Sequence, residues 1–170
     1  MKIVDLLKRE SVELNGKVTS KPEAIEKMVA LMAAGGNLAD VEAYKKGVFA
    51  REEESTTGIG EGIAIPHGKG DCVSKPGLAA MVIKNGVDFD SLDGEPVTLL
   101  FLIAAPNTED NVHLEVLSKL SMMLMDEQFT EALRNATSAE EVLSIIDKAD
   151  DERADIDEQL ADTGNAESDF

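Results

Sequence analysis

The 170-residue sequence contains a single cysteine, Cys72, no tryptophan and few aromatic residues, at 4%. One cysteine excludes an internal disulfide, and the paired cysteines of structural zinc sites are absent. No apolar run approaches the roughly 18 residues that cross a bilayer, and charges interrupt the first apolar residues too early for a signal peptide. We therefore expect a single domain in a reducing, cytoplasmic compartment, with no direct membrane insertion.

Basic residues are scarce: 16 lysines and arginines face 34 acids, for a net charge of -18. This balance repels a phosphate backbone, so it argues against nucleic acid as a partner. Nine acids and one base lie in residues 149–170, which leaves a net charge of about -10 on residues 1–148. We expect residues 1–148 to form the domain and residues 149–170 to form an acidic tail or interdomain linker, a helix that frays into disorder.

Capping signals predict four helices. Ser20-Lys21-Pro22-Glu23 is a capping box, and Gly35 ends the helix that follows it. A second helix begins near Asp40, a third at Asn111, and the last is capped by Ser138.

Three short apolar runs predict strands. They comprise Ile63–Ile65, Leu78–Ile83 and Val97–Ala104, and the third is wholly apolar, as expected of a central strand covered on both faces. The glycine-rich segment Thr57–Gly62 is expected to lack regular structure. The fold class is therefore α/β, with a small mixed sheet flanked by helices on both faces.

His67 is one of two histidines, and it lies between Pro66 and Gly68. Proline stiffens the strand up to the histidine, and alternation places His67 on the same face as Ile63 and Ile65. Gly68 is expected to let the chain turn away and to leave room beside the imidazole. A histidine held in this way is either a reactive group in a pocket or a hydrogen-bonded core residue.

His113 and Arg51 are candidate partners of His67. His113 falls in the first turn of the helix that begins at Asn111, where backbone N–H groups favour an anion. Arg51 continues the apolar stripe of its helix and is expected to point inward from the last turn. The alternatives are a hydrogen-bonded buried imidazole for His113 and a simple complement of the helix dipole for Arg51. Together the three side chains would suit a phosphate dianion.

The sequence does not match the common nucleotide-binding and zinc-site motifs, because the required residues or their spacing are absent. Gly62 and Gly68 enclose five residues rather than the four of a Walker A loop, and the earlier glycines precede a strand instead of following one. His113-Leu114-Glu115 lacks the cysteine half of a zinc deaminase site. No spacing indicates a metal site, so we expect neither a metal nor a cofactor.

The segment from Glu52 to Gly68 resembles the phosphorylation site of the fructose/mannitol-type IIA domains of the bacterial sugar phosphotransferase system. The pattern is an acidic or amide residue, six residues, then apolar-small-x-x-apolar-Ala-apolar-Pro-His-small. The similarity extends over roughly residues 1–147. It includes the segments Val87–Phe89, Phe101–Pro106 and His113–Leu120.

The resemblance implies a phosphoryl carrier. Such domains accept phosphate from phospho-HPr on the histidine matching His67 and pass it to a IIB domain, and a sugar is phosphorylated as it crosses the membrane through IIC. In the family, the residues matching His113 and Arg51 stabilise the phosphorylated state. The alternative is a regulatory protein of the nitrogen-related branch, which would act by phosphorylation-dependent protein binding.

Two features favour transport over regulation: the Ala104-Ala105-Pro106 segment and the linker-like tail. The sugar is set mainly by IIB and IIC, so this chain does not distinguish fructose from mannitol or another polyol. We also expect Asp88, Asp90 and Asp93 as a set to border the site and to steer the basic rim of HPr; the alternative is that each of them merely solvates a turn.

Overall fold

A computed structural model describes residues 2–108 and 111–167, with side chains described up to residue 153. The elements follow one another as η1 (Ile3–Leu6), β1 (Leu7–Glu13), α1 (Lys21–Ala34), α2 (Val41–Glu54), β2 (Gly58–Gly60), β3 (Ile63–Ala64), β4 (His67–Gly70), β5 (Gly77–Val87), β6 (Val97–Pro106), α3 (Val112–Met123), α4 (Glu127–Arg134) and α5 (Ala139–Glu167).

The strands form one mixed sheet in the order β1-β5-β6-β3-β2, and β4 pairs with β6 beyond the end of β3. Strand β6 pairs antiparallel with β5 and parallel with β3 and β4, so the prediction of a central apolar strand is confirmed. The expectation that Thr57–Gly62 lacks regular structure was wrong, because Gly58–Gly60 pairs antiparallel with β3.

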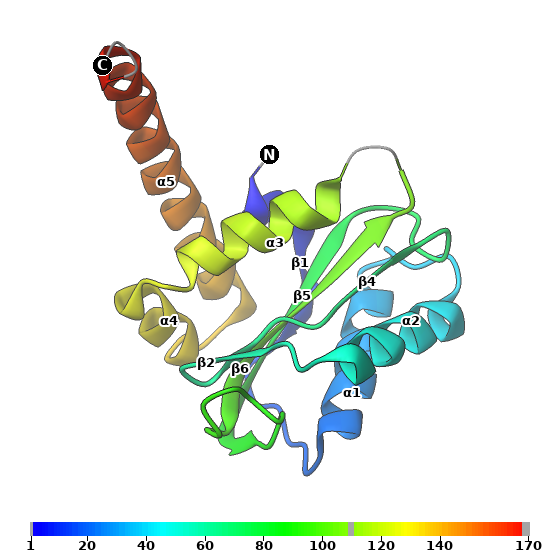
Figure 1. Ribbon diagram of the computed structural model, residues 1–170. Coiled ribbons are helices and arrows are strands. Elements are labelled where there is room, and N and C mark those ends of the chain that lie inside the picture. Colours follow the sequence, from blue (N-terminus) through cyan, green and yellow to red (C-terminus); the bar gives the residue numbers. More distant parts are fainter. Residues whose placement is uncertain (1, 109–110, 168–170) are drawn as a thin grey trace.

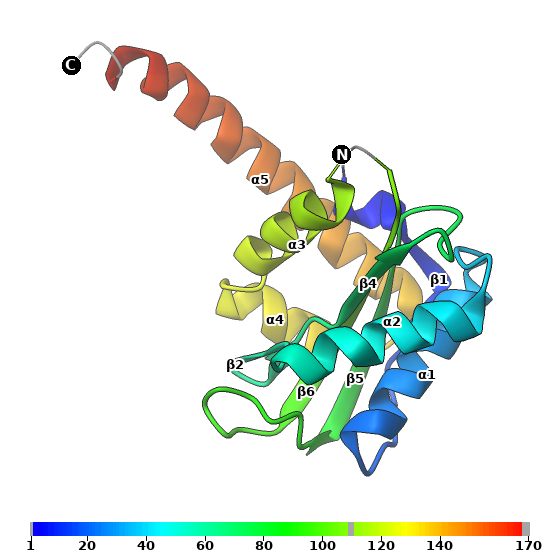
Figure 2. The same ribbon diagram turned by 45° about the vertical axis from the view of Figure 1, so that its right-hand side comes forward.

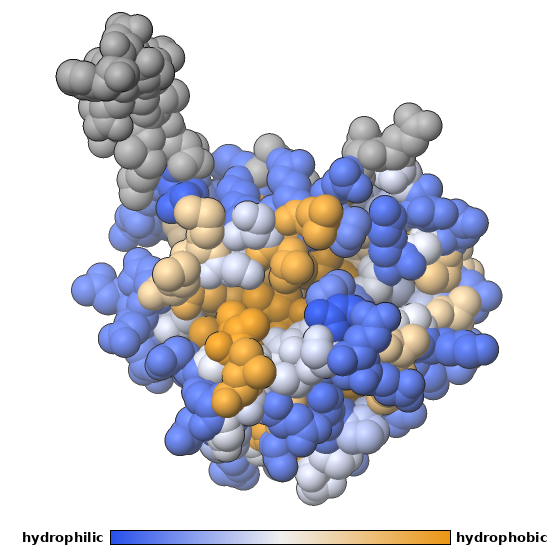
Figure 3. Space-filling model, viewed as in Figure 1, coloured by the Kyte–Doolittle hydropathy of each residue, from blue (hydrophilic) through white to orange (hydrophobic). Residues whose placement is uncertain are grey.

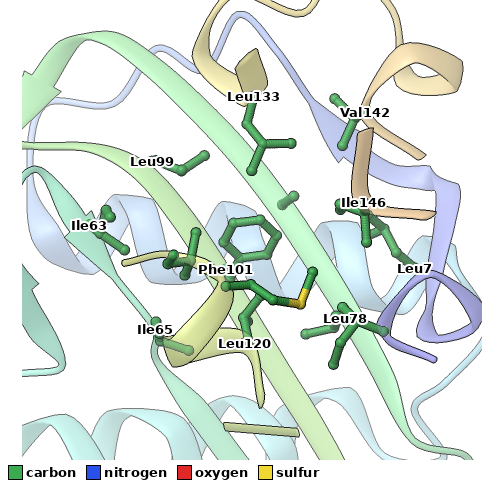
Figure 4. Close-up of a cluster of buried hydrophobic side chains, with 14 of the residues drawn as sticks. Leu7, Ile63, Ile65, Leu78, Leu99, Phe101, Leu120, Leu133, Val142 and Ile146 are labelled. Atoms are coloured by element: carbon green, nitrogen blue, oxygen red, sulfur yellow. The ribbon is translucent and has the colours of Figure 1, made fainter. Parts of the chain in front are cut away.

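Helices cover both faces of the sheet, as predicted. Helices α1 and α2 lie on one face, and α3, α4 and the start of α5 lie on the other (Figures 1 and 2). Each face has its own buried cluster. Figure 4 shows the cluster beneath α3–α5, in which Phe101 of β6 lies among Leu120, Leu133 and Ile146.

The helix ends show which capping predictions were right. The Ser20 hydroxyl accepts the Glu23 N–H at 3.3 Å, and the Ser138 hydroxyl accepts the Glu141 N–H at 3.1 Å. Helix α1 ends at Gly35, as expected. Asn111 precedes α3, but its side chain makes no capping hydrogen bond, because its backbone does not adopt the extended conformation usual for a cap.

The acidic C-terminal segment is helical as far as the structure describes it. Helix α5 runs to Glu167 and extends away from the sheet (Figures 1 and 2), and residues 168–170 lie outside the described residues. Its first turns belong to the folded body: Val142 and Ile146 are buried in the core, and Asp150 is 2% exposed. In the part of the chain that the structure describes, no helix is long and apolar enough to cross a membrane.

Candidate active site around His67

His67 is the first residue of β4, and it stands opposite Ile103 of β6. The Pro66 carbonyl accepts the Ile103 N–H at 3.1 Å, which continues the ladder across the proline. The expectation that the chain turns away at Gly68 was therefore wrong. Because the ladder to β6 continues through Gly70, the chain stays in the sheet and His67 is held by a regular strand on its C-terminal side.

Gly68 makes room for a helix rather than for the imidazole. A Cβ at this position would lie 2.9 Å from Tyr44 Cε1 and 2.9 Å from Val48 Cγ2, both on α2. The Tyr44 hydroxyl also donates to the Ile103 carbonyl at 2.7 Å, which fixes α2 against β6. Since successive residues of a strand point to opposite faces, the side chain of His67 lies on the face that α3 covers.

The ring of His67 is half-buried and is oriented by its own chain. Its Nδ1 lies 3.1 Å from the Ile65 carbonyl oxygen. A carbonyl oxygen can only accept, so this hydrogen bond requires a proton on Nδ1. The neutral ring then carries its lone pair on Nε2, the nitrogen needed for a nucleophile.

His113 lies in the first turn of α3 and is half-buried near His67. Burial lowers the pKa of His113 below its ordinary value, and the positive charges of Lys69 and His67 lower it further. The Nδ1 of His113 is buried and has no hydrogen-bond partner among the described residues. Both predicted histidines therefore lie on the side of the sheet that α3 covers.

Lys69 is a cation at this site that sequence reasoning missed. It is exposed and follows His67 by two positions in β4, so both side chains are on the same face of the sheet. Recognising His67–Gly70 as a strand would have revealed this alternation. Among the described residues, no three His, Cys, Asp or Glu side chains converge as a metal ion would require.

Arg51 points inward less than its position on the apolar stripe of α2 predicted. It is half-buried in the last turn of α2, and its Nη1 donates to the Ser55 carbonyl at 2.9 Å and lies 3.4 Å from the Ser55 hydroxyl. This is the dipole complement that the sequence left open as an alternative. The fully inward side chain at the end of α2 is that of the next residue, Glu52, which is 7% exposed.

The acidic loop does not border His67. Asp93 accepts the Glu61 N–H at 3.0 Å and the Glu95 N–H at 3.0 Å, and these bonds lower its pKa. The loop precedes Val97, whereas His67 stands opposite Ile103 on the same strand, about 20 Å further along. The expectation was wrong because sequence proximity to the strands did not indicate at which end of β6 the loop lies.

An apolar surface adjoins the two histidines. Figure 3 shows that hydrophobic side chains gather on the face formed by α3 and extend towards β2. The large exposed apolar side chains on these elements include Ile59 of β2, Leu114 and Met122 of α3, and Met125 just after it. Exposed apolar area of this kind, next to reactive groups, is typical of a surface on which another protein docks.

The fold and the site together define a class: a single α/β domain with a mixed sheet, with one histidine at the start of β4 and the other in the first turn of α3. Residues 5–149 match the family model of the phosphoenolpyruvate-dependent sugar phosphotransferase system, EIIA 2. The chain belongs to this family.

Curated relatives agree with this assignment. The chain is 44% identical over 150 residues to the PTS system fructose-specific EIIABC component of Bacillus subtilis, covering 88% of this chain and 24% of that protein. It thus spans about a quarter of the length of that relative. It is 39% identical over 137 residues to the PTS system fructose-specific EIIA component of Haloferax volcanii, covering 81% of this chain and 89% of that protein.

Solved structures share the fold. The crystal structure of the nitrogen regulatory protein IIA-Ntr from Neisseria meningitidis aligns with a TM-score of 0.78 at 35% identity, over 85% of this chain and 98% of that one. The enzyme IIA-Mtl of Escherichia coli, solved in complex with phosphorylated enzyme IIB-Mtl, aligns with a TM-score of 0.73 at 32% identity, over 84% of this chain and 99% of that one.

Proposed function

We propose that this IIA domain is a phosphoryl carrier that accepts phosphate from phospho-HPr on Nε2 of His67 and passes it to a IIB domain. The observation that carries the proposal is the hydrogen bond between His67 Nδ1 and the Ile65 carbonyl, 3.1 Å long, with His113 alongside. This bond leaves Nε2 unprotonated before any donor arrives. The nucleophile therefore needs no separate base.

In the proposed phosphoryl transfer, one P–N bond replaces another, and no metal ion bound to the domain takes part. The Nε2 lone pair attacks phosphorus in line, a P–N bond forms to His67, and the donor's P–N bond breaks with its electron pair returning to the donor imidazole. The phosphorylated His67 ring is cationic, with its proton still on Nδ1. The Ile65 carbonyl then accepts a charge-assisted hydrogen bond, which is stronger than the neutral one.

Three side chains are available to stabilise the phosphoryl group. His113 would bind a phosphoryl oxygen with its presently unpartnered nitrogen, and the α3 N-terminus favours an anion at the same place. Lys69 lies on the same face as His67. Arg51, at the end of α2, would have to exchange its bond to Ser55 for one to phosphate.

Both partners would dock on the apolar surface around α3. A donor and an acceptor that exchange one phosphoryl group must approach the same nitrogen, so they must use overlapping surfaces in turn. The IIA-Mtl complex with phosphorylated IIB-Mtl supports a IIB domain as acceptor. The net charge of -18 would favour a partner with a basic rim, such as HPr.

The curated relatives favour fructose as the sugar that this domain helps to phosphorylate. Both curated relatives described above are named as fructose-specific, at 44% and 39% identity. The chain would then feed a fructose-specific IIB domain and, indirectly, the membrane component IIC.

A regulatory role is the second candidate. The chain is 35% identical over 149 residues to a nitrogen regulatory protein of Bradyrhizobium diazoefficiens, and the fold matches IIA-Ntr of Neisseria meningitidis with a TM-score of 0.78. In that role the same phosphohistidine would control binding to a target protein.

Phosphotransfer in a reconstituted system tests the proposal. Incubation with phosphoenolpyruvate, enzyme I and HPr should add one acid-labile phosphate to the wild-type protein and none to His67→Ala. Addition of a fructose-specific IIB domain should then remove the labelled phosphate from the wild-type protein. Stable label on His67→Ala would contradict the assignment of His67. Label that IIB cannot remove would favour the regulatory role.

A further inference from the structure

Glu52 is buried at the end of α2 in a set of interactions that the phosphoryl chemistry does not use directly. Its carboxylate accepts the Thr57 N–H at 3.2 Å and also accepts the Thr57 hydroxyl. Lys21, at the start of α1, lies 2.9 Å away, and its ammonium group is 4.8 Å from the centre of the Phe89 ring. The side chains of Glu52 and Lys21 are 4% and 17% exposed, so the ion pair is shielded from water.

Stability alone explains this ion pair poorly. Withdrawing two charges from water costs about as much free energy as their attraction returns, so a buried pair gives little net stability compared with apolar side chains of the same size. What such a pair does supply is a fixed geometry for the groups bound to it. Here that group is the backbone of Thr57, which is itself 5% exposed.

One backbone hydrogen bond and one bond from the imidazole to a backbone carbonyl connect Thr57 to the ring of His67. The Thr57 carbonyl accepts the Ile65 N–H at 3.1 Å, and the Ile65 carbonyl lies 3.1 Å from His67 Nδ1. No flexible side chain intervenes, and Ile65 is 1% exposed. The orientation of the Ile65 peptide therefore depends on Thr57, and the position of Thr57 depends on the Glu52 carboxylate.

We infer that Glu52 is a positioning residue for His67: by fixing Thr57 it aims the Ile65 carbonyl at Nδ1 and holds the imidazole in the tautomer whose Nε2 is unprotonated. The inference rests on the proposed function, because it assigns a purpose to that tautomer. Glu52 itself touches neither the phosphoryl group nor the ring. It acts through the backbone of Thr57 and Ile65.

The variant Glu52→Gln tests the inference, because it keeps the size of the side chain and removes its charge and its pairing with Lys21. Long-range ¹H–¹⁵N spectra report which ring nitrogen of His67 carries the proton, independently of any phosphotransfer. We expect the wild-type ring to be in the Nδ1–H form and the variant to populate the Nε2–H form. Transfer from phospho-HPr should slow about 10- to 100-fold, by analogy with the loss of partners that orient metal-binding histidines.

Asp150→Asn is the matched control. Asp150 is equally buried, accepts the Ile3 and Val4 N–H groups at 3.2 and 3.0 Å, and lies 3.5 Å from Lys119. It belongs to α5 and has no part in the hydrogen bonds that lead to His67. Its loss should lower the unfolding free energy without altering the His67 tautomer or the transfer rate.

If Glu52→Gln fails to fold, Thr57→Val serves instead, since it removes only the hydroxyl that binds Glu52; the same shift towards Nε2–H is expected. An unchanged tautomer in the folded variant would overturn the inference, as would an equal shift in Asp150→Asn. A wild-type protein that shows the Nδ1–H form but takes no phosphate on His67 would refute the proposed function and leave the structural part of the inference standing.

Discussion

The protonation of His113 connects the geometry of the site to its chemistry. Burial and the positive charge of Lys69 lower its pKa, so protonation of the ring is disfavoured in the unphosphorylated protein. A phosphoryl dianion on His67 would reverse this balance, because an opposite charge within a few ångströms favours the protonated ring. His113 would therefore gain a proton when phosphate arrives and lose it when phosphate departs.

We accordingly predict that the pKa of His113 lies below 6.5 in the free protein and rises on phosphorylation of His67. An NMR titration of the His113 ring protons, with and without the phosphate, measures both values. The variant Lys69→Gln should raise the pKa of His113 in the free protein, because it removes one of the repelling charges. A pKa of His113 that is the same in both states would exclude it from binding the phosphoryl group.

Single residues also show where sequence reasoning reached its limit. Glycine between His67 and the rest of β4 indicated a turn, because glycine commonly permits one. Glycine is required at position 68 because Tyr44 and Val48 approach it closely. These residues precede it by 24 and 20 positions in the sequence. Such long-range packing leaves no local signal. Arg51 is half-buried and bonded to Ser55, whereas the neighbouring Glu52 has Lys21 as a buried partner.

Among the elements, α2 is the one whose packing sets the position of β4. A methyl group at Gly68 would meet Tyr44 and Val48 at 2.9 Å, and Tyr44 cannot move without losing its hydrogen bond to Ile103. We predict that Gly68→Ala lowers the unfolding free energy by about 1–3 kcal/mol, the usual cost of overpacking. Chemical denaturation measures this change.

Gly47, on the exposed side of the same helix, provides the control. No atom lies within 4 Å of a Cβ at this position. Gly47→Ala should therefore raise the unfolding free energy by up to about 1 kcal/mol, through helix propensity alone. Equal effects of the two substitutions would show that α2 does not pack closely on β4.

The elements that the sequence predicted are those with local signals. The caps at Ser20 and Ser138 and the apolar run of β6 depend on neighbouring residues, and they were found. Strand β1 was missed because it is an edge strand in which charged residues interrupt the apolar alternation. Strands β2 and β4 were missed because they are short and glycine-rich, and they exist only through pairing with β3 and β6.

At the scale of the whole molecule, the acidic segment and the body share a boundary that composition did not locate. Asp150 is the first acid of the segment, yet it holds the N-terminal η1 through two backbone N–H groups and approaches Lys119 of α3. It therefore joins η1 and α3 to the start of α5. The sequence placed the boundary at residue 148 because charge density is visible in a sequence, whereas burial of one carboxylate is not.

We predict that a chain ending at Ala149 loses about 2–3 kcal/mol of unfolding free energy relative to the full chain, since two buried N–H groups lose their acceptor. A chain ending at Ala161 retains Asp150 within a continuous helix and should match the full chain. Urea unfolding of the three proteins measures the difference. Equal stability of all three would mean that the domain needs nothing beyond Ala149.

The convergence of His67 and His113 follows from the sheet topology, which local patterns do not specify. His67 is placed by pairing with Ile103, and His113 is placed by the return of α3 over the same face. Each histidine could be singled out by its neighbours in the sequence. Their grouping around a phosphate was a hypothesis from the residues that the family resemblance strengthened, and the fold places both on the side of the sheet that α3 covers.

The central claim is that His67 carries the phosphoryl group on Nε2 because the Ile65 carbonyl occupies Nδ1. The most direct test is a long-range ¹H–¹⁵N spectrum of the protein after phosphorylation by phospho-HPr, in which the phosphorylated nitrogen is identified by its shift and its couplings to the ring protons. The account predicts phosphate on Nε2 of His67, with Nδ1 still protonated. Phosphate on Nδ1, or on a residue other than His67, would contradict it.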